Sequence, residues 1–561
     1  MEGEPLNETE LRQLDNQLDS HVASLTLLRE ERSAALAQVL YSFEDAIAGL
    51  PYGDMRSEQA AINLVDGLHF AVLWCFTHCA VAGTRPNLGF NRRAESCARE
   101  MLLAASQYSK AFDLMSMMWR KMGVGRMNED GAIRVSVGDP DAQLVLIAGR
   151  LIGRPMLPEA REDISRARDS FSYDRFRSAS GVRKAGRRAI VYEVPRELFD
   201  AFALEQRSIL KHSWELDETW DLGGYTIRQF RDFWCAVTAL AWIHTYACSA
   251  AGSNAEVRDS LLRFKTRHRW ESEISRYSGV DRAVVGLILR DVTFDPTLYG
   301  EGQSKPDLLC QPFIPVADDL LVLSSWLVRL VNSEEALWHL LSILRPNVHS
   351  VIRNNKERFW LEKLIPKLAD FGLHASGPYK FEYGSQSSDL DLLVVDQARR
   401  FVVAFQLKWL KAPEDVRDRD YNDRELKRGV DQAALALKWL KSAPAGLSSR
   451  SGLGADALNT FDYQALVLSK NTLGTGRLPV GLPLVNEPLL NYILGDPHRR
   501  SLETLYRVAE ERRYLPKPGV HFAWTDLTAS FGGIHFVGQG FGVTLLRPWD
   551  PLTDLDLAGL N

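Results

Sequence analysis

Residues 386–410 read QSSDLDLLVVDQARRFVVAFQLKWL. Two apolar runs, LLVVD and FVVAF, flank the polar tetrapeptide QARR, which is typical of two antiparallel strands joined by a short turn. Side chains alternate between the faces of a strand, so Ala404, Gln406 and Lys408 share one face. An amide and an ammonium on an apolar strand carry a desolvation cost unless they bind something. A metal ion beside a phosphate would meet that need.

The register of this hairpin decides which aspartate faces the polar pair. If residues 397–400 form the loop, Asp391 lies opposite Gln406. In the same register Asp389 lies opposite Lys408, and a slip of two residues brings Asp389 opposite Gln406 instead. In either register a carboxylate lies close enough to the pair to share one cation. A slip of one residue would turn both aspartates to the other face.

Helices and a further strand are expected around the hairpin. The segment NNKERFWLEKLIPKLADFG, residues 354–372, has apolar residues at helical spacing and a glycine at its end. The segment RELKRGVDQAALALKWLK, residues 424–441, is also typical of a helix, and FDYQALVLSK, residues 461–470, of a strand. The order of these elements predicts an α/β domain over residues 350–475, with a mixed sheet flanked by helices.

Residues 352–470 resemble the PD-(D/E)XK nuclease superfamily in the glutamate-bearing helix, the SDLDLLVVD strand and the FQLK strand. The resemblance implies a restriction-endonuclease-like fold in which Asp391 is the metal-binding carboxylate. Gln406 then stands at the (D/E) position and Lys408 at the lysine. The acid of the first helix would be Glu362, with Glu357 as the alternative.

Two glutamines refine this resemblance. Gln406 departs from the usual carboxylate, and a Gln-x-Lys strand is similar to that of Mrr-type restriction nucleases. Gln432, which follows Gly429 and Val430, is similar to the glutamine on the helix after the lysine strand in RecB-like nucleases. It would orient the site or contact the phosphate. The alternative for Gln432 is an ordinary position on the helix surface.

The resemblance implies hydrolysis of phosphodiester bonds in nucleic acid, with DNA favoured over RNA, by a metal-activated water. Mg²⁺, or Mn²⁺ in its place, would be held by Asp391, the Gln406 amide oxygen and the Leu407 backbone carbonyl. Lys408 would position the water and stabilise developing charge. Two alternatives stay open: an ordinary polar hairpin edge, and a catalytically inactive nuclease fold that binds nucleic acid or a partner protein.

The rest of the chain is expected to be mainly helical. With 561 residues, the chain exceeds the length at which a single core stops growing. A net charge of -5 means that nucleic acid would have to bind to local basic patches. The sequence predicts an N-terminal helical region over residues 1–150, a mainly helical middle region over residues 151–340 with a hairpin near residues 307–324, the nuclease domain over residues 350–475, and a β-rich extension packed on that domain over residues 476–561.

Basic residues that interleave with aromatic residues between 158 and 190 are typical of a surface that grips phosphates and stacks bases. A salt-bridged protein surface is the alternative, because four acids lie among them. Near the predicted site, the helix over residues 424–441 adds further cations. The predicted nucleic-acid contacts are Arg175, Arg177, Arg183, Lys184, Arg424 and Lys427.

Leucines at positions 11, 14, 18, 25 and 28 follow a spacing of three and four residues. They indicate either a short coiled coil, and with it a homodimer or higher oligomer, or a helix packed within its own domain. A nuclease with a large helical attachment resembles bacterial anti-phage defence effectors in architecture, and such an effector could also bind a partner protein.

The cysteines and the apolar stretches give an expected location. Six cysteines occur without CxxC spacing and are expected to be reduced residues of the core. Cys75, His78 and Cys79 fall within one helical turn, but a zinc site needs further ligands. We expect no membrane-spanning segment and no signal peptide, and therefore a cytoplasmic protein.

Overall fold

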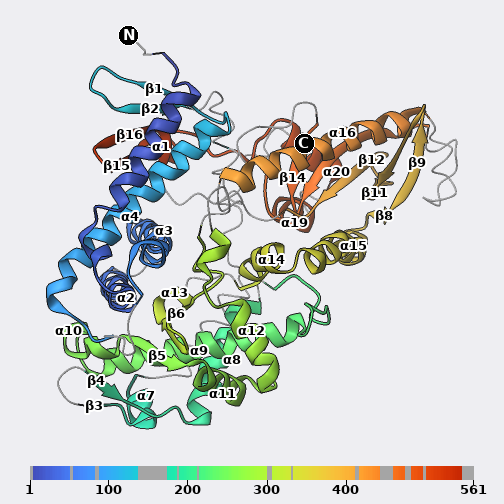
Figure 1. Ribbon diagram of the computed structural model, residues 1–561. Coiled ribbons are helices and arrows are strands. Elements are labelled where there is room, and N and C mark those ends of the chain that lie inside the picture. Colours follow the sequence, from blue (N-terminus) through green and yellow to red (C-terminus); the bar gives the residue numbers. More distant parts are fainter. Residues whose placement is uncertain are drawn as a thin grey trace.

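The chain folds as a mixed α/β protein in the computed structural model (Figure 1). The residues that the structure describes are 4–50, 55–81, 88–136, 144, 173–185, 189–211, 214–299, 306–329, 333–410, 416–442, 459–473, 482–496 and 501–545.

The N-terminal region is helical, as predicted, and ends in a small β-hairpin. Helix α1 starts at Glu8 and is capped by Asn7, whose side chain accepts hydrogen bonds from two backbone amides of the first turn. Leu11, Leu14 and Leu18 are buried in the core of this region, so the alternative of a helix packed on its own domain is confirmed. The elements are α1 (Glu8–Val22), η1 (Thr26–Arg29), α2 (Arg32–Ala48), α3 (Met55–His78), α4 (Arg92–Trp119), β1 (Val124–Met127) and β2 (Ile133–Ser136).

Helix α3 contains an apolar stretch that the sequence interpretation underestimated. Residues Ala60–His78 have a mean hydropathy of 1.4 over 19 residues, long and apolar enough by composition to cross a membrane. Leu68, Ala71, Val72 and Cys75 of this stretch are nevertheless fully buried against neighbouring helices. A core helix has the same composition, and α3 packs as one between α2 and α4.

The middle region is mainly helical, and the hairpin predicted near residues 307–324 is confirmed as the antiparallel pair β6 and β7. Strand β5 pairs with β7 to complete a three-stranded sheet. The elements are α7 (Tyr173–Ser180), β3 (Arg183–Ala185), β4 (Ala189–Val191), α8 (Arg196–Leu210), α9 (Ile227–Ala251), α10 (Asn254–Val257), η3 (Arg258–Ser260), β5 (Leu262–Thr266), α11 (Arg267–Ser278), α12 (Arg282–Asp291), η4 (Pro296–Tyr299), β6 (Phe313–Ala317), β7 (Leu320–Ser324), α13 (Ser325–Arg329) and α14 (Ser333–Leu344).

Residues 346–510 form a five-stranded mixed sheet with helices on both faces. The strand order is β14-β13-β12-β11-β8, in which β12, β13 and β14 run parallel and β11 runs antiparallel to its neighbours. The elements are α15 (Pro346–Asp370), β8 (His374–Ser376), β9 (Tyr379–Tyr383), β10 (Gln386–Leu390), β11 (Leu392–Asp396), β12 (Phe401–Lys408), α16 (Val416–Ser442), β13 (Asp462–Ser469), β14 (Leu484–Asn486), α19 (Glu487–Gly495) and α20 (Leu502–Glu510).

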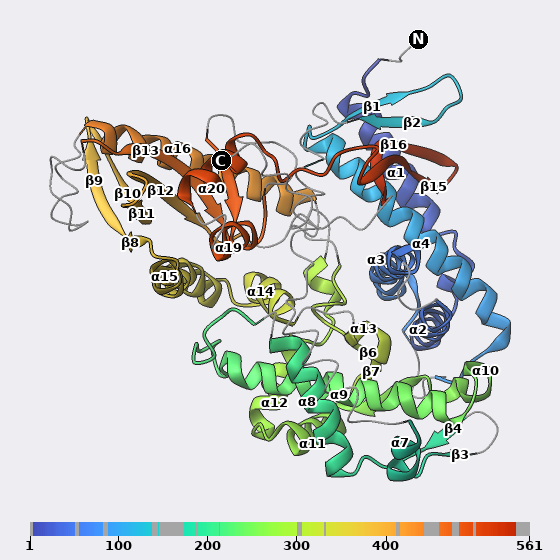
Figure 2. The same cartoon turned by 180° about the vertical axis from the view of Figure 1, so that it is seen from behind.

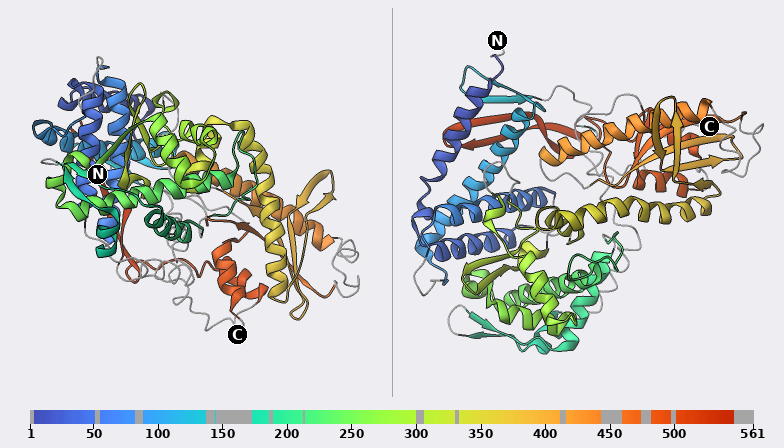
Figure 3. Two further views of the ribbon diagram at one scale, coloured as in Figure 1. Left: turned by 90° about the horizontal axis from the view of Figure 1, so that it is seen from below. Right: turned by 45° about the vertical axis from the view of Figure 1, so that its right-hand side comes forward.

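The alternation of side chains along β12 divides this sheet between two cores. Val403 and Phe405 pack with Trp360 and Leu364 of α15, in a core that continues into the middle region. The neighbouring residues Val402 and Ala404 pack in a separate core with α16. Figures 2 and 3 show α15 and α16 on opposite sides of the sheet. Gln406 and Lys408 continue the α16 face, as the sequence predicts.

The C-terminal region departs from the prediction. Helices α19 and α20 pack against the five-stranded sheet, but the last hairpin, β15 (Phe522–Phe531) and β16 (Ile534–Leu545), does not. Instead, β16 pairs with β2 of the N-terminal region to form a four-stranded sheet. Phe531 packs against Trp74 and Tyr108 there. The prediction that residues 476–561 pack as one extension on the 350–475 domain is therefore wrong for this hairpin.

Candidate active site

The hairpin register places Asp391 beside Gln406. Asp396 pairs with Phe401 and Leu392 with Phe405, which is the first of the two predicted registers. Asp391 immediately precedes β11, and its carboxylate accepts hydrogen bonds from the Gln406 amide and, at 2.8 Å, from the Leu407 backbone N–H. The carboxylate therefore lies across the end of β12 as predicted.

The strand SDLDLLVVD, expected over residues 388–396, is broken at Asp391. Residues before the break form β10, which pairs with β9 rather than with β12, so Asp389 lies opposite Lys380. The prediction that Asp389 pairs directly across the hairpin from Lys408 or Gln406 is therefore wrong. A side-chain carbon on Gly377 would lie 2.3 Å from the backbone oxygen of Asp391, so the chain after β8 crosses closely at the break.

Gln406 has an unsatisfied buried oxygen. The residue is 2% exposed, and its Nε2 donates to Asp391. Its Oε1 has no hydrogen-bond partner within the part of the chain that the structure describes. Such an atom is costly unless something binds it, and a divalent cation prefers amide and carboxylate oxygens. The site residues therefore fit a hard cation such as Mg²⁺.

Lys408 is held by helix α16. Its Nζ donates to Gln432 Oε1 at 3.2 Å, and Gln432 Nε2 donates to Asp389 Oδ1 at 3.4 Å. Gly429 gives the lysine room, because a side-chain carbon there would lie 3.0 Å from Lys408 Cε. Gln432 thus joins the predicted site, and it links Lys408 to Asp389, a connection that the hairpin pattern did not supply.

The helix acid of the site is Glu357 and not Glu362. Glu357 accepts a hydrogen bond from the Trp409 backbone N–H at 3.2 Å. Glu362 pairs with Arg358, and 61% of its side chain is exposed. Five residues along an α-helix turn a side chain by about 140°. The two glutamates therefore face different directions, and the assignment of Glu362 to the site is wrong.

Burial raises the pKa of Asp391 to about 7. The hydrogen bond from Leu407 and the charge of Lys408 lower the pKa, while Glu357 and Asp389 raise it further. A cation at this position would favour the ionised carboxylate. Without a cation, the surroundings of Asp391 thus favour the protonated carboxyl group. With a cation, they would favour the ionised carboxylate.

These side chains line one cavity of about 520 Å³. Its far wall comes from α14 and the start of α15, where Trp338, His349 and Lys356 face the site residues. The Lys356 ammonium lies 4.3 Å from the centre of the Trp338 ring, and burial lowers its pKa to about 7. Arg353 and Arg428 add positive charge to the lining. A cavity of this composition can take a phosphate beside a cation.

A second groove, of about 530 Å³, shares Arg428 and Gln432 with the cavity. It runs over β10 and α16, and its other lining includes Ser387, Ser388 and Lys438. The Ser387 hydroxyl and the Lys438 ammonium are exposed and suited to contact a phosphate backbone. The groove gives an extended ligand a path away from the cavity.

The predicted basic residues lie elsewhere. Among the described residues that line the cavity there is no Arg177, Arg183 or Lys184, and Figure 1 places α7 and β3 at the opposite end of the molecule from β12. Lys184 pairs with Glu256 at 2.8 Å, as in the salt-bridged alternative. The side chain of Arg175 and the whole segment over residues 158–172 lie outside the described residues.

The cations of α16 are also distributed differently from the prediction. Arg424 and Lys427 are exposed, and Arg424 pairs with Asp420 at 3.5 Å. Arg428, the next residue along, is the one that lines both the cavity and the groove. The signal that could have found it is its place in the helical repeat, because Arg428 lies four residues before Gln432 and therefore on the same helix face.

The site as a whole combines hard oxygen ligands with a lysine that is held in place. Asp391, Gln406 and Glu357 offer oxygens, and Lys408 offers a cationic donor on the same strand. The N–H and C=O of one residue leave a strand on the same side, so the Leu407 carbonyl faces the side on which its N–H meets Asp391.

In comparisons with known proteins, no family model, curated protein or solved structure matches the chain.

Proposed function

We propose that this protein is a metal-dependent nuclease of the PD-(D/E)XK type that hydrolyses phosphodiester bonds, with DNA favoured over RNA. One observation carries the proposal: Gln406 is buried beside the Asp391 carboxylate, to which its Nε2 donates, and its Oε1 has no partner among the described residues. Lys408 lies two residues further along the same strand face. A cation would satisfy the oxygens, and the lysine would meet the phosphate.

The residues that would hold Mg²⁺ or Mn²⁺ are Asp391, Gln406 through its amide oxygen, and Leu407 through its backbone carbonyl. A half-turn of the Gln406 amide exchanges its nitrogen and oxygen, which brings Oε1 to the side of the aspartate. When bound, the metal lowers the pKa of water and offsets negative charge on the phosphate. Glu357 adds a second carboxylate at the edge of this position.

The other groups of the site act on the phosphate and on one another. Lys408 places a positive charge where negative charge grows as the phosphodiester is attacked. Gln432 holds the lysine by accepting its hydrogen bond, and so keeps Nζ on the cavity side of the strand. Arg353 and Arg428 would bind flanking phosphates.

A second candidate is a catalytically inactive nuclease fold that binds nucleic acid or a partner protein. The direct hydrogen bond from Gln406 to Asp391 favours it, because the amide N–H already satisfies a carboxylate oxygen that a metal would otherwise bind. The two candidates differ in whether they need a metal. The inactive fold would bind nucleic acid equally well in the presence of Mg²⁺ and in the presence of a chelator.

The biological setting is proposed from architecture. A nuclease domain joined to a large helical region fits an effector of bacterial anti-phage defence that acts in the cytoplasm, as a homo-oligomer or with a partner protein. The helical region would act as a sensor, as an oligomerisation module or as a nucleic-acid clamp.

A matched pair of variants tests the assignment of the helix acid. Glu357→Gln is expected to lower metal-dependent cleavage by about 10-fold to 100-fold, because it removes a carboxylate that borders the metal position. Glu362→Gln, on the same helix but exposed, should leave the rate unchanged within about twofold. Initial rates on plasmid DNA with Mg²⁺ give the comparison. Equal losses in the two variants would contradict the placement of Glu357.

Metal affinity is expected to rise with pH through the region around 7. The buried Asp391 has a pKa raised to about 7, so below that pH a proton competes with the metal for its oxygen. Calorimetric titration with Mn²⁺ should show affinity falling by up to about tenfold per pH unit below the pKa. Asp391→Asn should bind weakly with no such slope. A wild-type affinity that is constant from pH 5.5 to pH 8 would contradict the prediction.

A further inference from the structure

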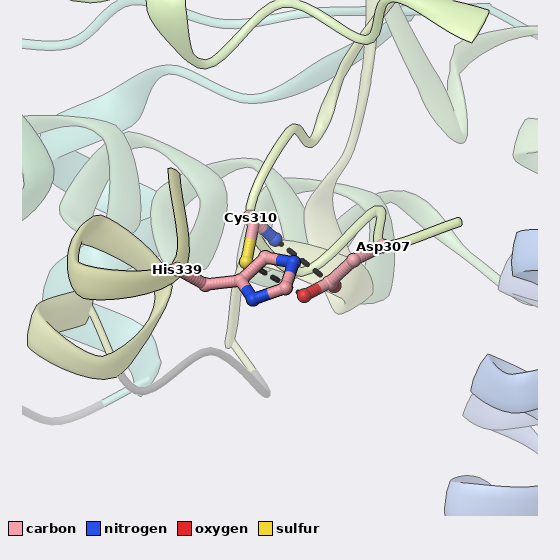
Figure 4. Close-up of side chains that lie close together, drawn as sticks. All are labelled: Asp307, Cys310 and His339. Carbon is pink, nitrogen blue, oxygen red and sulfur yellow. Dashed lines mark hydrogen bonds between the residues drawn. The ribbon is translucent and has the colours of Figure 1, made fainter. Parts of the chain in front are cut away.

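A second group of possible metal ligands lies outside the candidate active site. Asp307 and Cys310 belong to the turn that precedes β6, and His339 belongs to α14 (Figure 4). One ligand atom from each residue lies within 4.8 Å of the other two. The cluster thus joins a turn of the middle region to the helix that forms the far wall of the cavity.

The turn holds its two ligands in place through backbone hydrogen bonds. Asp307 Oδ1 accepts from the backbone N–H groups of Leu309, at 2.8 Å, and Cys310, at 3.2 Å. The Gln311 backbone N–H donates to the Asp307 carbonyl at 3.2 Å. Oδ2 is thereby directed at the thiol, with Cys310 Sγ at 2.6 Å. The carboxylate and the thiol are positioned together before any ion binds.

Burial makes this pair unusual. Asp307 is 8% exposed and Cys310 is 1% exposed, and His69 Nδ1 lies 4.0 Å from Asp307 Oδ1. A thiolate at Cys310, next to this carboxylate and in so buried a position, is costly unless a divalent cation binds both groups. His339 is less buried and also lines the 520 Å³ cavity, which gives an ion a route to the cluster.

The ligand chemistry selects the ion. A thiolate, an imidazole and a carboxylate are ligands of Zn²⁺, whereas Mg²⁺ takes oxygen ligands. In a tetrahedral zinc site the ligand atoms lie roughly 3.3–3.8 Å apart. The ligand atoms of the cluster lie within 4.8 Å of one another. In such a site the distance of 2.6 Å between Cys310 Sγ and Asp307 Oδ2 would lengthen by roughly 1 Å.

We propose that Asp307, Cys310 and His339 bind a Zn²⁺ ion that ties the turn at residues 307–310 to helix α14. Water completes the coordination from the cavity side. Binding forms a Zn–S bond and releases the thiol proton of Cys310 to solvent, with no change in oxidation state. Trp338 is the neighbour of His339 on α14 and lines the cavity, so the ion fixes that wall. The zinc site does not depend on the nuclease proposal.

The test is zinc binding by the full-length chain. Protein purified without chelator is analysed for zinc, then stripped with a chelator and titrated with Zn²⁺ and with Co²⁺. Wild type is expected to take up zinc and, with cobalt, to show a thiolate-to-metal charge-transfer band. Cys310→Ser and His339→Gln should weaken zinc binding by at least about 100-fold and, for Cys310→Ser, remove the band.

Two control variants test whether the loss of zinc is specific to the three residues of the cluster. Cys235→Ser changes a buried cysteine of α9 outside the cluster and should keep both zinc and the cobalt band. Asp391→Asn should also keep them, whatever it does to cleavage. A wild-type protein that binds no zinc and shows no thiolate band with cobalt would overturn the proposal, even if the variants fail to fold. Zinc uptake that is unchanged in Cys310→Ser would also overturn it.

Discussion

Asp391→Asn is expected to lower metal-dependent cleavage by about three powers of ten, which corresponds to about 4 kcal/mol of transition-state stabilisation. The substitution keeps the size of the side chain and an oxygen that can accept from Leu407. It removes the negative charge that Gln406, a neutral ligand, cannot supply. Initial rates with saturating DNA over a range of Mg²⁺ concentrations measure the loss.

The same variant should be more stable than the wild type at high pH without metal. The pKa of Asp391 is raised to about 7, so the folded protein binds a proton there that the unfolded chain releases at lower pH. Wild-type stability from this group is therefore lost as the pH rises towards 7. Thermal unfolding above pH 7 should show a higher midpoint for Asp391→Asn, and near pH 4 little difference. A lower midpoint above pH 7 would contradict this account of the site.

Lys408→Met is the second change with a large expected effect. Methionine keeps the buried stem of a residue that is 8% exposed but removes the ammonium that Gln432 holds. Loss of one positioned charge-stabilising donor costs about 10²–10³ in rate. Metal binding should remain, because the lysine is not a ligand. Rates and Mn²⁺ affinity measured on the same preparation separate the two effects.

Lys427→Met provides the control for this prediction. Lys427 lies on α16 but is exposed, and it is not among the described residues that line the cavity. Its loss should change cleavage by less than about threefold at low salt. If Lys427→Met impaired cleavage as much as Lys408→Met did, the lysine of β12 would have no special role and the site would be misplaced.

The hairpin could be predicted because its pattern is local. Side-chain alternation fixes the face of Gln406 and Lys408, and the polar tetrapeptide at residues 397–400 indicates the loop. These two features left two registers open, and the observed pairing of Asp396 with Phe401 is one of them. The break at Asp391 could not be predicted, because it depends on β9 and on the close approach of Gly377.

The choice between Glu357 and Glu362 could not be made from the sequence pattern alone. Both glutamates lie on one predicted helix, and the apolar face of this helix indicates which side is buried. The apolar face does not indicate which turn of the helix lies at the end of β12. That depends on where α15 packs along the sheet, through contacts such as Trp360 with Trp409. The C-terminal hairpin is a similar case, since its partner strand β2 lies about 400 residues earlier in the chain.

The described part of the basic segment lies away from the candidate active site. Charge and aromatic composition describe what a surface can bind, but not where it lies. Lys184 forms an ion pair with Glu256, and Phe176 is fully buried in the core of the middle region. The cations that line the cavity, such as Arg353 and Arg428, are isolated in sequence and gather only when α15 and α16 fold around the sheet.

The most direct test of the central claim is cleavage by the purified full-length protein. Supercoiled plasmid, linear duplex DNA, single-stranded DNA and RNA are incubated with Mg²⁺ or Mn²⁺, beside an EDTA control and the Lys408→Met variant. We predict cleavage of DNA that requires the metal and is lost in the variant. Absence of cleavage on every substrate, with wild type and variant binding nucleic acid equally with and without metal, would contradict the nuclease assignment and favour the inactive scaffold.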